Sequence, residues 1–115
     1  MGSGYKNLIV WQKSILLTKQ IYEITHQFPK EELFGLTSQM RRAVVSIPSN
    51  VAEGSRRVSK KDTNNFYSIA FGSASELETQ IEIAYELRFI NIDTYTQLIS
   101  LTTEILKMLN KLTTY

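Results

Sequence analysis

The stretch from Gln39 to Gly54 limits the possible folds more than any other part of the chain. Its apolar residues recur every three or four positions, which is the spacing of one face of an α-helix. Pro48 interrupts this face and removes a backbone donor, so the pattern predicts a kinked helix. Gly54 is expected to end the helix as its C-cap, because glycine readily adopts positive φ. Starting at Leu36 or Thr37, the apolar face comprises Leu36, Met40, Ala43, Val44, Ile47 and Val51.

A preceding helix is predicted from about residue 7 to residue 27, with Asn7 as its N-cap. Pro29 ends it, because the residue before a proline is biased away from the helical region. Two adjacent apolar stripes make its apolar face wider than one neighbouring helix requires. These stripes are Val10, Leu17, Ile21, Ile24 and Phe28, and beside them Leu8, Trp11, Ile15 and Tyr22.

The longest helix is predicted from residue 60 or 61 to about 88, with Ser59 or Asp62 as its cap. It also carries two apolar stripes, and the small residues at 72–75 would let another backbone approach closely. A last helix follows from a cap at Asn91 or Asp93 to about residue 112. The first stripe of the longest helix is Phe66, Ile69, Ala70, Ser73, Leu77, Ile81 and Ala84, and its second is Tyr67, Phe71, Ala74 and Tyr85. The stripe of the last helix is Tyr95, Leu98, Thr102, Ile105 and Leu109.

Four helices with short connections predict an all-α, up-down-up-down antiparallel four-helix bundle. Residues 7–115 form its single domain, and residues 1–6 are interpreted as a flexible leader or a remnant of an expression vector. The wide apolar faces predict a homo-oligomer, because unburied apolar patches usually mark interfaces. The interface is expected at Trp11, Phe71, Gly72, Ser73, Glu78 and Glu82.

Composition narrows the class of protein. The chain has 115 residues, enough for one core, and its 43% hydrophobic and 21% charged residues are ordinary for a soluble domain. It has no cysteine, which excludes disulfides and thiolate metal sites. The absence of cysteine fits the reducing cytoplasm, and we expect the protein to act there. No apolar run is long enough for a transmembrane helix, and the N-terminus does not resemble a secretory signal, so no membrane partner is expected.

Charge is distributed unevenly although the net charge is only +2. The segment 41–61 holds six basic residues and the acid Glu53, whereas 62–104 holds seven acids and the base Arg88. The basic segment can contact nucleic acid, or the two segments can face each other within or between chains. The candidate nucleic-acid contacts are Arg41, Arg42, Arg56, Arg57, Lys60 and Lys61.

The sequence contains few residues in the patterns of catalytic or metal sites, and none of these patterns is complete. Glu23 and His26 have the spacing of di-iron ligands, but such a site needs two copies of the pair and further carboxylates. Glu78, Glu82 and Glu86 lie four residues apart and are interpreted as a solvated or salt-bridged helix edge rather than a cation site. There is no thiol nucleophile, no serine with a suitably placed histidine and no phosphate-binding glycine loop. We therefore expect no catalytic residue, no metal, no cofactor and no enzymatic activity.

Several segments resemble one family of proteins. They read Val-Trp-Gln-Lys at 10–13, Phe-Pro-x-x-Glu-x-Phe-Gly-Leu at 28–36, Gln-x-Arg-Arg-Ala-x-Val-Ser-Ile-Pro-Ser-Asn-Val-Ala-Glu-Gly at 39–54, and Gly-Ser-x-x-Glu-Leu-Glu-x-Gln at 72–80. Together they resemble the four-helix bundle proteins named for the intervening sequences of bacterial 23S ribosomal RNA genes. The resemblance covers about residues 8–90, and the last helix matches in pattern only.

The resemblance implies a bundle that assembles as a ring, typically a homopentamer. It also implies kinship with the accessory protein of diversity-generating retroelements, a basic pentameric barrel that binds nucleic acid and the reverse transcriptase. By resemblance, Arg41, Arg42, Arg56 and Arg57 are the residues that would contact nucleic acid. Two hypotheses stay open: an oligomeric scaffold that binds RNA or DNA, and a purely structural or protein–protein scaffold. A third, an enzyme or metal protein, would need a metal ion that is lost on changing Glu23 or His26.

Overall fold

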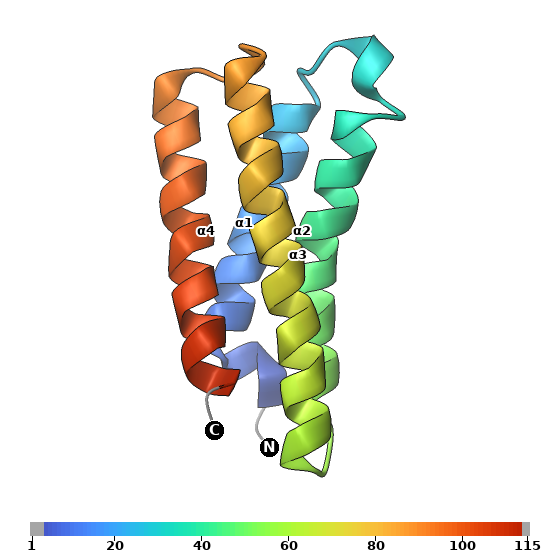
Figure 1. The fold of residues 1–115 in the computed structure, drawn as a ribbon, viewed down its shortest axis with the longest axis vertical. Helices are drawn as coiled ribbons and strands as arrows, with labels where there is room; N and C mark the ends of the chain where they lie inside the picture. The colour runs from blue at the N-terminus through green and yellow to red at the C-terminus, as the bar shows by residue number, and fades with distance from the viewer. Residues whose placement is uncertain (1–3, 114–115) are drawn as a thin grey trace.

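Four α-helices lie side by side along most of their length in the computed structural model, which describes residues 4–113 (Figure 1). Successive helices run in opposite directions, and each contacts the next, with α1 against α4 completing the bundle (Figure 1). Residues 4–113 contain no strand, so the prediction of an all-α fold with four helices is confirmed. The elements are η1 (Gly4–Asn7), α1 (Ile9–Thr25), η2 (Lys30–Glu32), α2 (Leu36–Ser55), α3 (Lys60–Glu86) and α4 (Ile92–Thr113), the two η elements being 3-10 helices.

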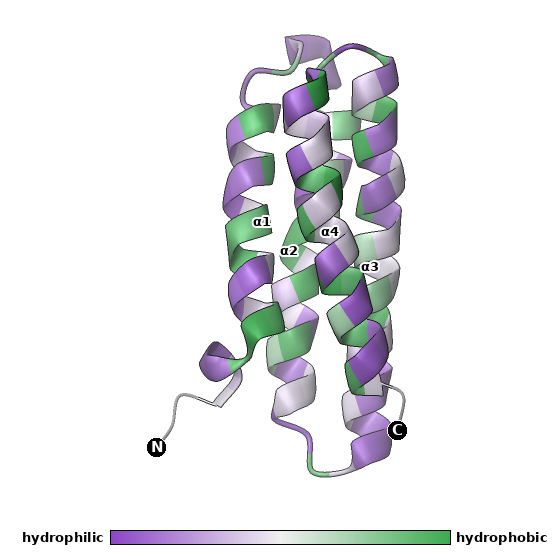
Figure 2. Cartoon of the chain, turned by 90° about the vertical axis from the view of Figure 1, so that its left-hand side faces the viewer, coloured by the Kyte–Doolittle hydropathy of each residue, from purple (hydrophilic) through white to green (hydrophobic). Residues whose placement is uncertain are grey.

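All four helices contribute to one apolar core. The predicted face of α2 is buried over its whole length, and fully burying one such side chain stabilises the fold by about 1.5–3 kcal/mol. The connections before α2 and between α2 and α3 are largely hydrophilic (Figure 2). The fully buried large side chains are Leu17, Ile21, Met40, Val44, Ile47, Val51, Leu77, Ile81, Leu98, Thr102, Ile105 and Leu109.

The start of α1 differs from the prediction. Leu8, not Asn7, occupies the N-cap position and makes no side-chain cap bond, because Asn7 ends the preceding 3-10 helix. The side chain of Gln12 donates to the carbonyl of Lys6 at 2.9 Å, and the rings of Tyr5 and Trp11 meet edge to face, with centroids 5.3 Å apart. Tyr5 and Lys6 of the predicted leader therefore contact the bundle, whereas residues 1–3 lie outside the described part of the chain.

Helix α2 continues through Pro48 as one ribbon (Figure 1). The proline has no N–H, so the carbonyl of Val44 loses the donor that one helical turn would supply. The hydroxyl of Thr18, on the neighbouring α1, lies 3.5 Å from that carbonyl oxygen, but it donates its proton to the Ser14 carbonyl at 2.8 Å. This contact therefore does not replace the missing bond, and the bend at Pro48 stays a prediction.

Gly54 is not the C-cap that the sequence suggested. It is a buried helical residue, and α2 ends one residue later with Arg56 as its cap in the right-handed helical region. A Cβ at position 54 would lie 2.9 Å from ring carbons of Tyr67 and 3.0 Å from the Cβ of Phe66. The hydroxyl of Thr63 donates to the Gly54 carbonyl at 2.9 Å. Glycine is therefore required here for the close approach of α2 and α3.

The other predicted caps are found where the sequence places them. The side chain of Ser59 accepts a bond from the backbone N–H of Asp62 at 3.1 Å, which caps α3. The side chain of Asn91 accepts from the N–H of Thr94 at 2.8 Å, at the start of α4. Between these helices Arg88 adopts a φ of 65°, and the next N–H bonds back to the Ala84 carbonyl at 2.8 Å, closing the end of α3.

One side of α3 stays uncovered in the single chain. Ile69, predicted to be in the core, is 51% exposed, because the adjacent Ala70 takes the buried position. Gly72 is exposed, and a Cβ there would meet nothing within 4 Å. The close backbone approach predicted for residues 72–75 is therefore not made at Gly72 within this chain. We call the exposed residues Ile69, Gly72 and Ile83, which lie within about 60° of one another around the helix, the outer face of α3.

Candidate nucleic-acid interface

The six basic residues predicted to contact nucleic acid do not form one patch. Arg41 and Arg42 lie within α2, whereas the other four lie at or after its end and at the start of α3. Those four share one end of the bundle with η1 and the end of α4 (Figure 1). We call this the basic end; its charged residues are Lys6, Arg56, Arg57, Lys60, Lys61 and Lys111, with the acids Glu53 and Asp62.

Aromatic rings hold two of the guanidinium groups at the basic end. The guanidinium of Arg56 lies 5.1 Å from the ring centroid of Tyr5, and that of Arg57 lies 4.8 Å from the ring of Phe66. Arg57 also forms an ion pair with Glu53, one helical turn earlier. The side chains of Arg56 and Lys61 are exposed and meet no carboxylate among the described residues. This end can therefore present cations to phosphate groups.

The opposite end of the bundle is acidic. At or near this end lie six acidic residues and four basic or potentially basic ones, including Arg41, which bonds to the last residue of α1. The phenol of Tyr95 donates to Glu82 at 2.6 Å, and this bond raises the pKa of Tyr95 above its ordinary value. The acids are Glu23, Glu31, Glu32, Glu82, Glu86 and Asp93, and the others are His26, Lys30, Arg41 and Arg88.

The basic segment does not pair with the acidic edge of α3 inside the chain. Within residues 4–113, Lys13 pairs with Glu104, 3.1 Å apart, and Arg57 pairs with Glu53. Glu82 instead accepts from Tyr95 of α4. The alternative of pairing between chains stays a prediction.

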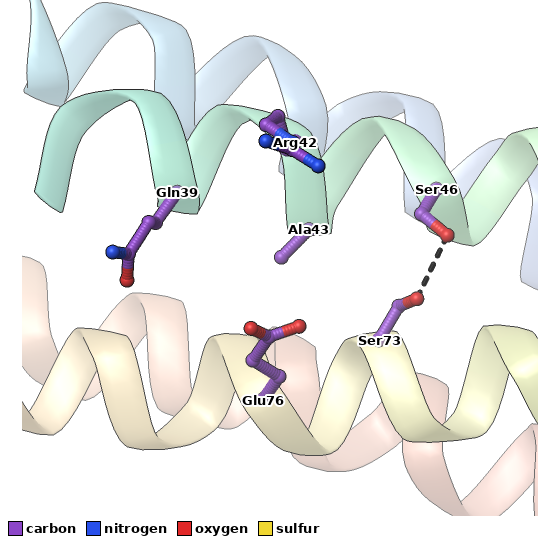
Figure 3. A pocket seen from close by; sticks show the side chains of 6 residues that line it. All are labelled: Gln39, Arg42, Ala43, Ser46, Ser73 and Glu76. Atoms are coloured by element: carbon purple, nitrogen blue, oxygen red, sulfur yellow. Dashed lines mark hydrogen bonds between the residues drawn. The ribbon is translucent and has the colours of Figure 1, made fainter. Parts of the chain in front are cut away.

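Arg42 lines a polar groove between α2 and α3 (Figure 3). The groove has a volume of about 380 Å³, and the carboxylate of Glu76 is directed across it toward α2 (Figure 3). Ser73 donates to the hydroxyl of Ser46 at 2.8 Å and joins the two helices at one end of the groove. Arg42 forms no ion pair with Glu76. Gln39, Ser46, Ser73 and Glu76 occur in the segments that carry the family resemblance, but their spacing alone did not identify a groove.

Arg41 faces the other side of α2, toward α1. Its Nε donates to the hydroxyl of Thr25 at 3.0 Å, and its guanidinium lies 4.7 Å from the ring centroid of Tyr22. Arg41 and Arg42 are adjacent in sequence, so the helix turns them about 100° apart. The structure therefore separates two residues that the sequence placed in one site.

The residues predicted for an oligomer interface fall into two groups. Trp11 is partly buried against Tyr5, and Ser73 is bonded to Ser46, so both already make contacts within the chain. Phe71, Gly72 and Glu82 are exposed, and Glu78 is half-buried. The interface itself stays a prediction.

Glu23 and His26 are exposed side chains at the end of α1. Residues 4–113 contain no group of three or more histidine, aspartate or glutamate side chains placed to hold a metal ion. None of the described helices is both long and apolar enough to cross a membrane.

Four antiparallel helices around one core, with a cationic end, place the molecule among the small helical-bundle proteins. The chain belongs to the family of 23S rRNA-intervening sequence proteins, whose family model matches residues 6–111. This confirms the resemblance and extends it into α4, where the sequence matched in pattern only.

One similar solved structure is a protein of unknown function from the S23 ribosomal protein family of Bacteroides thetaiotaomicron VPI-5482. It shares 25% sequence identity with this chain, at a TM-score of 0.86. The likeness covers 93% of this chain and 100% of the other. Among curated proteins, none matches this chain.

Proposed function

We propose that this protein is a non-catalytic, homo-oligomeric scaffold that acts in the cytoplasm and binds RNA or DNA through its basic end. The observation that carries the proposal is the gathering of Lys6, Arg56, Arg57, Lys60 and Lys61 at one end of the bundle. Cations contact phosphates without regard to base sequence, and each contact releases counterions. Two guanidinium groups there are already positioned by aromatic rings, which lowers the entropy lost on binding.

The outer face of α3 supports the homo-oligomer. Ile69 and Ile83 are 51% and 42% exposed, and Gly72 between them leaves room for a close neighbour. Exposed apolar side chains on one helix face are typical of a surface that another chain covers. A pentameric ring is the assembly that the family resemblance implies.

Nucleic-acid binding is tested with a fluorescent structured RNA and a DNA duplex, by anisotropy at increasing salt. Replacing Arg56 and Lys61 with glutamine is expected to weaken binding and to reduce the slope of log K against log salt by about 1.8, at about 0.9 per lost contact. The matched control replaces Lys19 and Lys107, two exposed lysines on helix sides, and should keep the native slope. Equal weakening in both variants, or no binding by the native protein at low salt, would contradict the proposal.

The second candidate is a structural or protein–protein scaffold without nucleic-acid binding, and the exposed apolar residues of α3 favour it equally. Native mass measured with and without structured RNA separates the two. An oligomer whose mass does not change with RNA supports the second candidate. The double variant Ile69→Ser/Ile83→Ser should lower the native mass under either candidate, and an unchanged mass would place the interface elsewhere.

A further inference from the structure

Arg41 is held in a fixed orientation between α1 and α2. Its Nε donates to Thr25 at 3.0 Å, and the same threonine donates to the Ile21 carbonyl at 2.6 Å, so the acceptor is itself fixed. The ring of Tyr22 lies 4.7 Å from the guanidinium carbon. Thr25 binds the Nε and Tyr22 covers one face of the guanidinium. The two terminal nitrogens stay available, and together they form a fork that can donate two hydrogen bonds to one ligand.

No carboxylate neutralises this guanidinium. Within residues 4–113, no acidic side chain lies within ion-pair distance of Arg41, and its terminal nitrogens have no hydrogen-bond acceptor. The residue is nevertheless half-buried. A half-buried cation without a counter-charge favours binding of an anion, because partial burial of the cation weakens its solvation by water.

Arg41 lines a hollow of about 310 Å³ where the end of α1 meets η2 and the start of α2. Lys30 and His26 share the lining, which contains no acidic residue. Phe28, Pro29 and Leu33 form an apolar wall, and the hydroxyl-bearing Thr25 and Thr37 complete the site: Thr25, His26, Phe28, Pro29, Lys30, Leu33, Thr37 and Arg41.

A second, more open hollow adjoins the first and shares Arg41 and His26 with it. Its lining includes Glu23, an exposed carboxylate. An anion would therefore be repelled on that side. Glu31 and Glu32 follow Lys30 in η2 but do not line the smaller hollow, and Glu32 accepts from the N–H of Leu36. This difference selects the smaller hollow as the anion site.

We propose that this hollow binds a phosphate monoester. Two permanent cations match the two negative charges of a monoester better than the single charge of a carboxylate or a phosphodiester. The fork of Arg41 suits two phosphate oxygens, and Lys30 supplies a mobile point charge. The apolar wall fits a ligand whose ester group is a hydrocarbon or aromatic ring.

The proposed site is separate from the basic end. It lies where α1 passes to α2, at the opposite end of a bundle whose longest extent is 43 Å (Figure 1). The proposal therefore does not depend on nucleic-acid binding at the basic end. A monoester phosphate can come from a small metabolite or from the 5′ end of a nucleic-acid strand, and the probes below distinguish these sources.

The test is an NMR titration of the ¹⁵N-labelled full chain at low salt with phenyl phosphate. We expect saturable shifts of the amides of residues 25–37 and of the Arg41 side-chain N–H, with dimethyl phosphate binding about tenfold more weakly. If a 5′-phosphorylated dinucleotide binds better than phenyl phosphate, the phosphate monoester belongs to the end of a nucleic-acid strand. If the dinucleotide binds equally or more weakly, the phosphate monoester belongs to a small molecule. Shifts confined to the basic end, or no saturation, would overturn the proposal.

The adjacent arginine provides a matched control. Arg41→Lys keeps the charge but loses the fork, so phenyl phosphate should bind about tenfold more weakly. Arg42→Lys makes the same chemical change on the side of α2 that faces α3, and should leave the affinity unchanged. Lys30→Gln lies in a surface turn, so it tests the site even if changes at Arg41 disturb folding. Native affinity in both Arg41→Lys and Lys30→Gln would contradict the assignment.

Discussion

The two sides of α3 use small residues in different ways. Toward α2, small residues bring two helices into close contact: Gly54 meets the ring of Tyr67, and Ser46 bonds to Ser73. We call this contact the α2–α3 seam. On the outer face of α3, Gly72 is equally small but touches nothing within 4 Å.

The difference shows that a small residue in a helix has no single structural meaning. At the seam, adding a methyl group would force atoms together, whereas on the outer face it would occupy open space. An outer glycine lowers helix stability without any compensating contact in the single chain. The outer face is therefore where we expect a second subunit, and the following predictions test this contrast.

The largest effect is expected at the seam. Gly54→Ala should lower the free energy of unfolding by about 1–3 kcal/mol, because the new Cβ would lie 2.9 Å from the ring of Tyr67. Urea denaturation at one fixed protein concentration measures the change, since oligomers gain stability with concentration. Native stability in this variant would mean that α2 and α3 can separate without loss.

Removing the hydrogen bond across the seam is expected to lower the free energy of unfolding by a smaller amount. Ser73→Ala should cost about 1 kcal/mol, because it leaves the half-buried Ser46 hydroxyl without this donor. Ser68→Ala, an exposed change on the same helix, should stay within about 0.5 kcal/mol of the native protein. A double-mutant cycle with Ser46→Ala measures the coupling, and additive effects would show that the bond contributes nothing.

Adding a methyl group on the outer face should raise the free energy of unfolding rather than lower it. Gly72→Ala is expected to raise the free energy of unfolding by about 0.5–1 kcal/mol if the position stays open, because alanine is the better helix former. If a second subunit packs closely on Gly72, the same change should instead lower the native mass. Calorimetry combined with native mass spectrometry distinguishes these results.

The smallest effect concerns alkaline pH. Burial raises the pKa of the Tyr67 phenol above its ordinary value of 10.0, so the folded chain retains this proton after the unfolded chain has lost it. Stability should therefore fall as pH rises past that ordinary value, and Tyr67→Phe should flatten the fall in urea titrations at about pH 9–11. Tyr95→Phe should flatten it less, since its partner Glu82 is exposed and solvent screens their bond. A steeper fall in Tyr67→Phe would contradict this reasoning.

Much of the fold could be predicted from apolar spacing alone. The face of α2 and the caps at Ser59 and Asn91 depend on local sequence, and the structure bears them out. Gly54 could not be interpreted correctly, because a glycine that ends a helix and a glycine that admits a neighbouring ring look alike in sequence. Ile69 was assigned to the core because the spacing allows either it or Ala70 to face inward.

The candidate site was less predictable because it depends on how the helices rotate against their neighbours. The sequence grouped Arg41 with Arg42, but one faces α1 and the other faces α3. It also gave no reason to bring Lys30 and Arg41 together, since Lys30 begins a 3-10 helix and Arg41 lies in α2, with a turn between the two elements. Only the basic residues near the α2–α3 connection remain together, because they are close in sequence.

The separation of charge along the bundle changes what the net charge of +2 means. The molecule is 43 Å long, whereas mobile ions screen charge over about 8 Å at physiological ionic strength. An approaching polyanion would therefore experience the cationic end almost without the distant carboxylates. The two ends therefore act as separate electrostatic surfaces, and the cationic end alone would attract a polyanion.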